Sequence, residues 1–588
     1  MKFLLIFIFA FNFIFDFSSA RTSESLKVEI EDGKIIGGWM TSLSGKIIRA
    51  FMGIPYAAPP IGDLRFKAPQ KVKPWGNVSL LAQKEPPMCT QINTFNDMYS
   101  ETVYGQEDCL YLNVYTPEIT KKITKKLPVL VWIHSGAWLV GHAGYTDYSP
   151  EYLLEHDIIL VTGNYRLGAL GFLSTEDEYS PGNYGFKDQL EILRWVKKNI
   201  EKFGGDANSV TLAGESAGAA AVNYHMFSPK SRGLFHRAIS QSGHLFNPWA
   251  DPAHKGKAKE NAIRLAEKLH CSKSGISTKS LIECLRKISA EEITRVLRDL
   301  PVWDNDPLIA FQPVIENFDS NEEPFISELK YEKLSLDIPW IVGITSEEGL
   351  MKSASFFNNA EKLKELEENW KKILPVTFYY DHLPENEVDE INQKIYNFYF
   401  KESSFSNNKE NLTNMWSEGW FGGFFDNLSY RFKSNDRENT FVYLFTHKGA
   451  ASFSEYFLGE KEEFYGTCHV DEIFHLFPIQ KYFPDYMSAM PTQEDRKITE
   501  IITKLWANFV TFGNPTPNYS EESKFPIWKP ATKFPLDFMK IGNENGASEI
   551  LLEMKKDLYP ERANFWIELR KKYGLHLWAF DLNGRDEL

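Results

Sequence analysis

The segment that most constrains this chain is residues 214–218, a GxSxG sequence with Ser216 at its centre. The residues before it, 209–213, alternate like a short buried strand, and the small residues 217–221 can begin a helix. A strand, a sharp turn and a helix in this order raise the central serine above a sheet, where its hydroxyl can act as a nucleophile. Glycine is required at both ends because a side chain there would collide with the neighbouring helix or strand. The alternative is an ordinary glycine-rich turn.

The composition is that of a folded, enzyme-sized protein. Of 588 residues, 43% are hydrophobic and 14% aromatic, which is ample for a large core, and 24% are charged. The net charge is −14, and Lys and Arg form no stripe or block of the kind that binds a phosphate backbone. We therefore do not expect a nucleic-acid partner.

The first twenty residues have the pattern of a cleaved signal peptide. Lys2 precedes an apolar run over 3–15, and residues 18–20 supply the small side chains that a signal peptidase reads. The run is shorter than the ~20 apolar residues that a spanning helix needs, and no later segment is long enough to span a membrane. A membrane anchor is the alternative. We expect a mature chain with one domain over 21–584.

Two further features indicate the lumen of the secretory pathway. The chain ends in Arg585-Asp586-Glu587-Leu588, close to the Lys-Asp-Glu-Leu address that a receptor of the endoplasmic reticulum retrieves. We therefore expect residence in the reticulum lumen, with secretion as the alternative. Sequons that predict N-glycosylation occur at Asn77, Asn411, Asn427 and Asn518.

The cysteines fit the same oxidising compartment. There are five, at Cys89, Cys109, Cys271, Cys284 and Cys468. Sequence cannot determine their connectivity, but Cys89 with Cys109, and Cys271 with Cys284, would close short loops, which are the easier ones to close in the unfolded chain. Cys468 is then left as a free, buried thiol with no catalytic role.

Apolar, β-rich runs recur along the chain and predict strands of one buried sheet. They cover residues 127–133, 158–162, 210–213, 238–240, 338–345 and 440–445. Helical patterns lie between them, for example over 188–203 and 359–373. Alternating strands and helices predict an α/β fold with a largely parallel sheet.

A nucleophilic serine needs a base and an acid, which follow it in the order acid, histidine in α/β-hydrolases. His469 is the best candidate base because 466–472 looks like a loop entering a helix, whereas His475 lies in an amphipathic run and is interpreted as structural. Glu347 and Glu348 come just past the predicted strand 338–345, where such enzymes carry catalytic groups. The residues alone do not choose between them, and a helix-capping glutamate is the alternative.

The predicted strand 127–133 runs into a turn of small residues that includes Ser135, Gly136 and Ala137. Such a turn leaves backbone N–H groups free to point into a cavity, as in an oxyanion hole. Each donor of that kind contributes roughly 2.7–4 kcal/mol in the transition state of acyl transfer. An ordinary tight turn is the alternative.

With these residues in place, the chain resembles the type B carboxylesterases, the cholinesterase-like branch of the α/β-hydrolases, over nearly its whole mature length. The resemblance rests on FGGDANSVTLAGESAG at 203–218, EDCLYLNVYTP at 107–117, FMGIPYA at 51–57 and NYRLG at 164–168. It implies an α/β-hydrolase fold: a mostly parallel central sheet flanked by helices, with large insertions. General or microsomal carboxylesterases are the most similar members.

The resemblance also implies the roles of individual residues. Ser216 becomes the nucleophile, His469 the base, and Glu348 the acid because it directly precedes Gly349. The other implied features are oxyanion donors at the backbone of Gly136, Ala137 and Ala217, disulfides Cys89–Cys109 and Cys271–Cys284, and structural ion pairs Arg65–Glu107 and Arg166–Asp188.

Three features of the sequence bear on which esters the chain can accept. The family's usual run of three glycines reads Ser-Gly-Ala at 135–137, so added side-chain atoms can narrow the acyl pocket. The segment between Cys89 and Cys109 has no tryptophan, whereas cholinesterases look like they use one there to hold choline by a cation–π contact. Choline esters are therefore not expected substrates. Glu215 resembles the carboxylesterases and disfavours a juvenile hormone esterase, which tends to have glutamine there.

The expected activity is hydrolysis of a carboxylic ester to an alcohol and an acid. Ser216 attacks the carbonyl, His469 accepts its proton, Glu348 orients the imidazole, and water then releases the acyl group. No metal or organic cofactor is expected. One alternative is a catalytically inactive adhesion or binding protein of the same fold, which the complete triad disfavours. The other is a hydrolase specific for a lipid or hormone ester.

Overall fold

The computed structural model describes residues 26–93, 100–118, 125–272, 275–328, 338–401, 403–433, 439–458, 465–479, 492–517, 525–543 and 551–576. The expected signal peptide at 1–20, the C-terminal tetrapeptide 585–588 and the sequon at Asn518 lie outside these residues.

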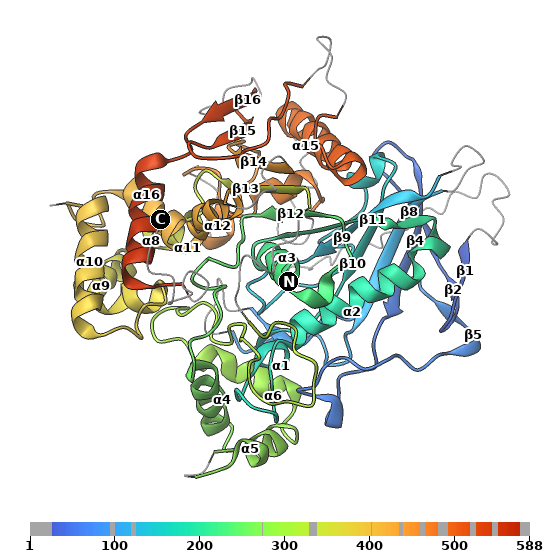
Figure 1. Ribbon diagram of the computed structural model, residues 1–588, viewed down its shortest axis with the longest axis horizontal. Helices are drawn as coiled ribbons and strands as arrows, with labels where there is room; N and C mark the ends of the chain where they lie inside the picture. The colour runs from blue at the N-terminus through green and yellow to red at the C-terminus, as the bar shows by residue number, and fades with distance from the viewer. Residues whose placement is uncertain are drawn as a thin grey trace, which may run out of the picture.

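A large sheet, which has 11 strands in the described part of the chain, runs through the centre of the molecule (Figure 1). Its strands, from one edge to the other, are β16 (Leu551–Lys556), β15 (Asp537–Gly542), β14 (Thr440–Phe445), β13 (Trp340–Thr345), β12 (Arg237–Gln241), β11 (Gly205–Glu215), β9 (Leu127–Ile133), β10 (Ile159–Gly163), β8 (Tyr111–Pro117), β4 (Ile47–Pro55) and β3 (Gly38–Thr41). Neighbours from β15 to β10 are parallel, and those towards the two edges are antiparallel. The fold is therefore an α/β-hydrolase fold with a mostly parallel central sheet.

All six predicted strands lie in this sheet. β9 and β14 have the predicted bounds, and β11 begins earlier than its apolar run, at Gly205, with a register shift between Gly205 and Val210. The antiparallel strands towards the edges were not predicted. In β8, for instance, a polar residue interrupts the apolar pattern: Asn113 is buried and donates hydrogen bonds to Ala143 O and Thr162 Oγ1.

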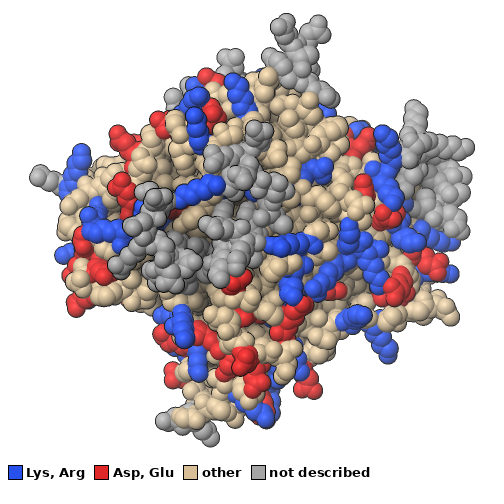
Figure 2. Space-filling model, viewed as in Figure 1, with Lys and Arg blue, Asp and Glu red and all other residues tan. Residues whose placement is uncertain are grey.

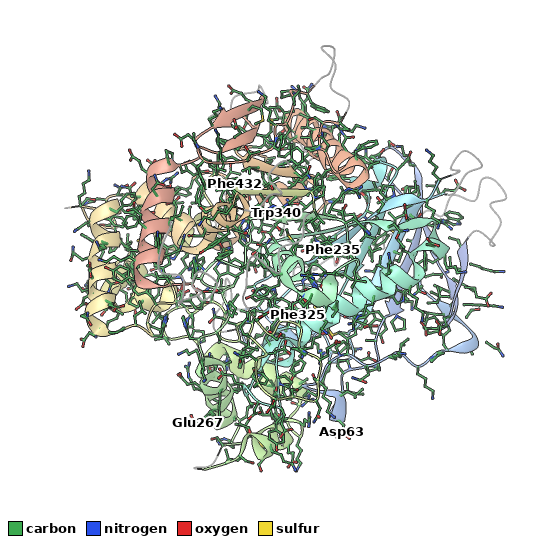
Figure 3. All side chains as sticks on the ribbon, in the orientation of Figure 1. Asp63, Phe235, Glu267, Phe325, Trp340 and Phe432 are labelled. Atoms are coloured by element: carbon green, nitrogen blue, oxygen red, sulfur yellow. A yellow bond between two sulfur atoms is a disulfide. The ribbon has the colours of Figure 1, made fainter. Side chains whose placement is uncertain are left out.

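The alternation of side chains along the strands divides the interior into two cores, one on each face of the sheet. In β9, Val129 and Val131 belong to one core, and Leu130 and Trp132 to the other. This is the period of two that a strand buried on both faces requires. Figure 3 shows that Phe235, Phe325, Trp340 and Phe432 lie within the body, whereas Asp63 and Glu267 lie at its periphery.

Helices cover both faces and extend beyond the sheet (Figure 1). They are α1 (Gly168–Phe172), α2 (Tyr184–Asn199), α3 (Ala217–Phe227), α4 (Lys257–Lys268), α5 (Thr278–Leu285), α6 (Ala290–Arg295), α8 (Leu350–Phe357), α9 (Ala360–Thr377), α10 (Glu385–Tyr399), α11 (Lys409–Phe421), α12 (Gly423–Arg431), α13 (Ser454–Leu458), α15 (Gln493–Phe512) and α16 (Pro560–Tyr573). Short 3-10 turns are η2 (Gly62–Leu64), η3 (Leu153–Glu155), η4 (Ile200–Phe203), η5 (Pro229–Ser231), η6 (Val296–Asp299) and η8 (Asp471–His475).

The helices divide by position. α1, α2 and α3 contribute to the core that contains Val129 and Val131, and α15 contributes to the core that contains Leu130 and Trp132. The segments α4–α6 and α8–α12 are the large insertions, which follow β12 and β13 in the chain. Both predicted helices form: 188–203 corresponds to α2 and η4, and 359–373 to α9, whose N-cap is Asn359.

Smaller strands lie outside the large sheet. β1 (Lys27–Ile30), β2 (Gly33–Ile36) and β5 (Gly76–Leu81) form one small sheet, and β6 (Gln91–Ile92) pairs with β7 (Val103–Tyr104).

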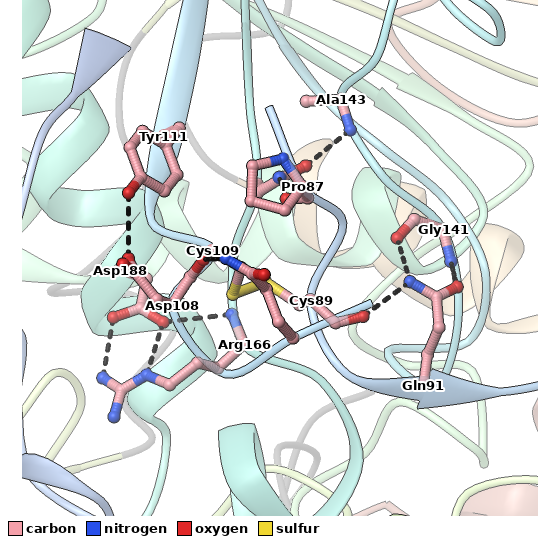
Figure 4. Close-up of a disulfide and its surroundings, with 12 residues drawn as sticks. Pro87, Cys89, Gln91, Asp108, Cys109, Tyr111, Gly141, Ala143, Arg166 and Asp188 are labelled. Atoms are coloured by element: carbon pink, nitrogen blue, oxygen red, sulfur yellow. Dashed lines mark hydrogen bonds and ion pairs between the residues drawn. A yellow bond between two sulfur atoms is a disulfide. The ribbon is translucent and has the colours of Figure 1, made fainter. Parts of the chain in front are cut away.

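Both expected disulfides are present, Cys89–Cys109 and Cys271–Cys284, and Cys468 is a buried free thiol. The Cys89–Cys109 disulfide lies beside the buried ion pair of Arg166 with Asp188, whose two hydrogen bonds measure 2.8 and 2.7 Å (Figure 4).

The second expected ion pair also forms. Arg65 Nη2 donates to Glu107 Oε2 at 2.8 Å. Two parallel hydrogen bonds to a carboxylate give such arginine pairs geometric specificity, so both pairs fix loops beside the sheet.

Charged side chains of both signs lie next to one another on the face seen in Figure 2, in line with surface ion pairs such as Lys126 with Glu201. In the described ranges, no helix has the length and apolar character needed to cross a membrane.

Candidate active site

Ser216 occupies a sharp turn between the end of β11 and the start of α3. Its φ of 53° and ψ of −123° lie in a region that ordinary residues avoid, and its backbone N–H donates to Gln241 O at 2.8 Å on the neighbouring strand. A Cβ on Gly214 would lie 2.5 Å from the carbonyl carbon of Gly218, and one on Gly218 would lie 2.2 Å from Ile133 O. Both glycines are therefore required for strand and helix to approach this closely, as the sequence pattern predicted.

Strand register brings the other candidates to the same edge. At the end of β11, Glu215 is paired with Gln241 of β12, and at the end of β13, Thr345 is paired with Phe445 of β14. β12 is also paired with β13, so the four strands end at the same edge of the sheet. Parallel strands that end together place the loops that follow them side by side. The segments carrying Ser216, Glu348 and His469 therefore meet, although they are far apart in the sequence.

The three side chains form one hydrogen-bonded chain. His469 Nε2 lies 2.8 Å from Ser216 Oγ, and His469 Nδ1 lies 2.6 Å from Glu348 Oε2. The other carboxylate oxygen of Glu348 accepts the backbone N–H of Thr345 at 2.8 Å, and the ring of Phe421 packs 4.5 Å from that of His469. His469 and Glu348 are each 1% exposed, so the hydrogen bonds operate away from bulk water.

The structure separates the two glutamates that the residues alone left open. Glu348 contacts His469, whereas the carboxylate of Glu347 accepts the backbone N–H of Thr467 at 2.7 Å. His475, interpreted as structural, is buried in η8 and hydrogen-bonds Thr499 rather than Ser216.

A second carboxylate, Glu215, lies 3.2 Å from His469 Nε2. Burial acts to lower the pKa of His469, but the carboxylates of Glu215 and Glu348 outweigh it and raise that pKa to about 9. Burial has the opposite effect on a carboxylic acid and raises the pKa of Glu215 to about 8. The carboxylates around His469 therefore stabilise the imidazolium that forms when the ring accepts a proton. Sequence reasoning did not place Glu215 here, although its position directly before Ser216 was the available signal.

The turn after β9 has the form expected of an oxyanion hole. Gly136 has a φ of 106° and Ala137 one of 54°, and Gly136 O accepts the N–H groups of Leu139 and Val140. The backbone N–H groups of Gly136, Ala137 and Ala217 donate to no residue in the described ranges. Ala217 is the first residue of α3, whose dipole adds positive potential at that end.

Ser135 and Ala137 stand where the family usually has glycine, and neither side chain obstructs the turn. A Cβ at Gly136 would lie 2.1 Å from Val140 O, so glycine is retained where it is required. The Cβ of Ala137 is accommodated, and the hydroxyl of Ser135 lies 3.3 Å from the hydroxyl of Tyr148.

These groups border a small cavity of about 80 Å³. Its lining residues are Asn93, Ser135, Gly136, Ala137, Val140, Gly141, Asp147, Tyr148, Glu215, Ser216, Met351, Phe453, Tyr456, Phe457, His469, Val470, Ile473 and Ile479. Part of its apolar lining comes from Met351 of α8 and from Phe453, Tyr456 and Phe457 in the segment that contains α13. No sequence pattern marked those residues, because helices inserted between strands bring them there.

The loop closed by the Cys89–Cys109 disulfide carries Gln91, which contacts the cavity-lining residue Gly141 (Figure 4). Gln91 accepts the backbone N–H of Gly141 at 2.8 Å and donates to Gly141 O and Cys89 O, each at 2.9 Å. The disulfide thereby anchors a side chain that fixes a cavity-lining residue.

One group of side chains is close enough together to hold a metal ion, as far as the described residues go. It consists of His447, His475 and Asp495, all buried. His447 Nε2 already lies 2.9 Å from Asp495 Oδ1, and none of the three lines the cavity at Ser216.

The described sequons differ in their access to solvent. Asn77 is exposed on β5, and Asn411 is half-buried with its amide donating to Tyr399 O. Asn427 is 1% exposed, and its amide donates to Asn223 Oδ1 at 2.5 Å. A glycan is bulky and attaches to that amide nitrogen, so the folded chain leaves no room for one on Asn427. This burial argues against a glycan on Asn427, and the sequon there stays a prediction.

Comparison with known proteins gives consistent matches. The model of the family described as "Carboxylesterase family" matches residues 24–566. The chain is similar to juvenile hormone esterase of Tribolium castaneum, with 34% identity over 552 residues, covering 91% of this chain and 92% of that protein. It is similar to liver carboxylesterase 1 of Oryctolagus cuniculus, with 32% identity over 588 residues and 93% of each covered.

Among solved structures, that of juvenile hormone esterase from Manduca sexta with OTFP covalently attached superimposes with a TM-score of 0.79. Its identity is 26%, and the match covers 93% of this chain and 99% of that one.

Proposed function

Because the chain belongs to the carboxylesterase family and is thus a carboxylic ester hydrolase, we propose that Ser216, His469 and Glu348 carry out its reaction. The observation that supports this most directly is the hydrogen-bonded chain from Ser216 Oγ through both ring nitrogens of His469 to Glu348. A nucleophile, a base and an orienting acid in this geometry are what acyl transfer requires.

The reaction begins when Ser216 Oγ attacks the ester carbonyl carbon and its proton passes to His469 Nε2. Glu348 holds Nδ1, which keeps Nε2 free to accept that proton and stabilises the imidazolium that forms. Glu215 lies close to the same ring and, when ionised, adds negative charge on the side where positive charge develops. The proton then moves from Nε2 to the departing alcohol oxygen, and an acyl-serine remains.

The oxygen of the tetrahedral intermediate is stabilised by backbone N–H groups. Those of Gly136, Ala137 and Ala217 are the proposed donors, because they border the cavity at Ser216 and are not used elsewhere in the described chain. Water activated by His469 attacks the acyl carbon in the second half-reaction and releases the carboxylic acid.

The cavity favours an ester with an apolar group. Met351, Phe453, Phe457 and Ile479 present hydrocarbon or aromatic surface, and burial of such surface contributes about 25 cal/mol per Å². Among the described residues that line the cavity there is no tryptophan, which supports the proposal that choline esters are poor substrates. Two of the similar proteins are juvenile hormone esterases by name, so an apolar hormone ester belongs in the substrate panel.

Chemical labelling of Ser216 tests the proposal. An organophosphate should modify the wild-type chain once per molecule at Ser216, and Ser216→Ala should lose both the adduct and turnover by roughly 10⁶-fold. Retained turnover in a folded Ser216→Ala variant would overturn the proposal. A panel of short and long acyl esters, choline esters and hormone esters then ranks substrates, and activity confined to choline esters would contradict the assignment of the cavity.

We further propose that the chain enters the secretory pathway through residues 1–20 and is retrieved to the endoplasmic reticulum through 585–588. The two disulfides fit an oxidising compartment. Deletion of 585–588 should send the protein into the medium, whereas unchanged retention would exclude the retrieval address. Of the described sequons, exposed Asn77 is the favoured glycan site, and Asn77→Gln should increase electrophoretic mobility while Asn427→Gln should not.

A further inference from the structure

Glu347 and Glu348 are consecutive in the chain but contact different parts of the segment that carries His469. Glu348 contacts the imidazole itself, through Nδ1. Glu347 contacts the main chain two residues earlier: its Oε2 accepts the N–H of Thr467 at 2.7 Å, and its own N–H donates to Thr467 O at 3.1 Å. Both backbone polar groups of Thr467 are therefore bound by one residue.

This contact is closely packed as well as hydrogen-bonded. Gly466 has a φ of 144°, and a Cβ there would lie 2.6 Å from Cγ of Glu347 and 2.7 Å from its Oε2. A residue other than glycine would displace the carboxylate or the loop. Glu347 and Cys468 also form an isolated parallel β-bridge, so the loop is paired at this point with the segment just after β13.

The remaining hydrogen bonds of the loop involve its own residues and neighbouring segments. Asp471 accepts the N–H of Cys468 at 2.8 Å, and Thr467 Oγ1 donates to His447 O at 3.3 Å. Glu347 differs because it belongs to the segment that also carries Glu348. The position of His469 relative to its acid is therefore set across a single short stretch of backbone.

We propose that Glu347 is a positioning residue for the general base: it holds the main chain of Thr467 so that the ring of His469 bridges Ser216 and Glu348. The inference rests on the proposed function of those three residues. Glu347 touches neither the substrate cavity nor the reacting atoms. Release of Thr467 lets the loop shift, and a misplacement of about 1 Å in a catalytic group can lower the rate by about 10²-fold.

The role requires an acceptor oxygen and not a negative charge. Ser346 Oγ and the N–H of Thr467 both donate to the same oxygen of Glu347, and the carbonyl oxygen of a glutamine can accept both. Burial raises the pKa of Glu347, which these two hydrogen bonds oppose; Arg562 and Glu410 are the charged groups nearby. Glu347→Gln should therefore preserve the contact that Glu347→Ala removes.

A matched control exists elsewhere in the chain. Glu176 is also half-buried and accepts backbone N–H groups from a distant segment, that of Gly256 at 2.7 Å and that of Ala258 at 3.2 Å. Neither Glu176 nor that segment lines the cavity. Glu176→Ala therefore reports what the loss of such a clamp does to the folded chain in general.

The experiment measures kcat, KM and melting temperature of the full-length variants with a short apolar ester. Glu347→Ala should lower kcat by about 10-fold to 10²-fold and leave KM within about two-fold, because the loop and not the cavity moves. Glu347→Gln should stay within about three-fold of wild type. Glu176→Ala should keep the wild-type kcat even if it melts earlier.

Three results would overturn the inference: wild-type kcat in folded Glu347→Ala, an equal loss in Glu347→Gln, or the same loss of kcat in Glu176→Ala. If Glu347→Ala does not fold, Glu347→Asp is measured in its place. Aspartate keeps the negative charge, but its side chain is one methylene shorter, so its oxygens lie farther from Thr467. This variant should show the same loss of kcat at constant KM. Organophosphate labelling of wild-type Ser216 separates the two proposals: absence of an adduct rejects the triad itself, whereas a normal adduct with an unaffected Glu347→Ala rejects only the positioning role.

Discussion

The turn at Ser216 and the loop at His469 are held in place by different means. Around Ser216 the constraint is steric: β9, β11 and α3 approach so closely that Gly214 and Gly218 have no room for a Cβ. Around His469 the loop is held by hydrogen bonds that the carboxylates of Glu347, Glu348 and Asp471 accept. A steric constraint fails at once when an atom is added, whereas a hydrogen-bonded loop loses function in steps that depend on the contact removed.

The two kinds of support also differ in how far they reach along the chain. The serine turn is built from residues next to one another in sequence and from the neighbouring strand. The histidine loop depends on partners 120 and more residues away, such as Glu347 and Glu348. The nucleophile is thus a largely local property, and the base is positioned only when the segment after β13 and the loop at His469 have come together.

Among variants that test the supports of the two segments, the largest effect is expected from Glu348→Gln, which changes the contact to the imidazole itself. An amide in place of the carboxylate favours the wrong tautomer of His469 and no longer stabilises the imidazolium, so kcat should fall by about 10⁴-fold. Steady-state kinetics with a short apolar ester measures this. A loss no greater than that of Glu347→Gln would show that the two glutamates are not functionally distinct.

Gly218→Ala tests the steric side of the comparison. The added Cβ would lie 2.2 Å from Ile133 O, so α3 must move away from β9 and carry Ser216 and the N–H of Ala217 with it. We expect kcat/KM to fall by about 10²-fold or more and stability to fall by about 1–3 kcal/mol, measured by melting. Gly38→Ala is the control, because a Cβ there has only Gln83 Cγ within 4 Å, at 3.9 Å. It should behave as wild type.

Asp471→Asn probes the internal support of the histidine loop. Its carboxylate accepts the backbone N–H groups of Phe453 and Cys468 and the hydroxyl of Ser452. An amide nitrogen must replace one oxygen and would face a donor, which costs about 1–3 kcal/mol in a buried site. We expect a lower melting temperature and a kcat reduced by several-fold at constant KM. A larger loss of kcat than in Glu347→Ala would make Asp471 the principal support of the loop.

The smallest effect is expected from Glu215→Gln, and it lies in the pH dependence. The charge of Glu215 stabilises protonated His469, so its removal should lower the pKa of His469, which otherwise is raised to about 9. Because His469 must be neutral to accept a proton, the acidic limb of the kcat/KM profile should move to lower pH. The plateau should fall because the imidazolium of the transition state loses a partner. An acidic limb that stays in place would show that Glu215 is not charged in the working enzyme.

Sequence patterns predicted the central part of the fold well. The parallel strands β9 to β14 are buried on both faces and rich in β-branched residues, so each is marked by its own residues. The antiparallel strands towards the edges carry buried polar residues such as Asn113, whose partners lie on other segments. These strands can be identified only when the positions of those partners are known.

The active site divides in the same way. The sequence by itself determined that Ser216 sits on a strand-to-helix turn, because the glycines and small residues that the turn needs are its immediate neighbours. The tertiary structure decided which of Glu347 and Glu348 meets His469, that Glu215 lies beside the same ring, and that Asn427 is buried. The physical reason is distance along the chain. Steric limits between adjacent residues follow from a few consecutive residues, whereas a hydrogen bond between distant loops forms only after the sheet has brought those loops together.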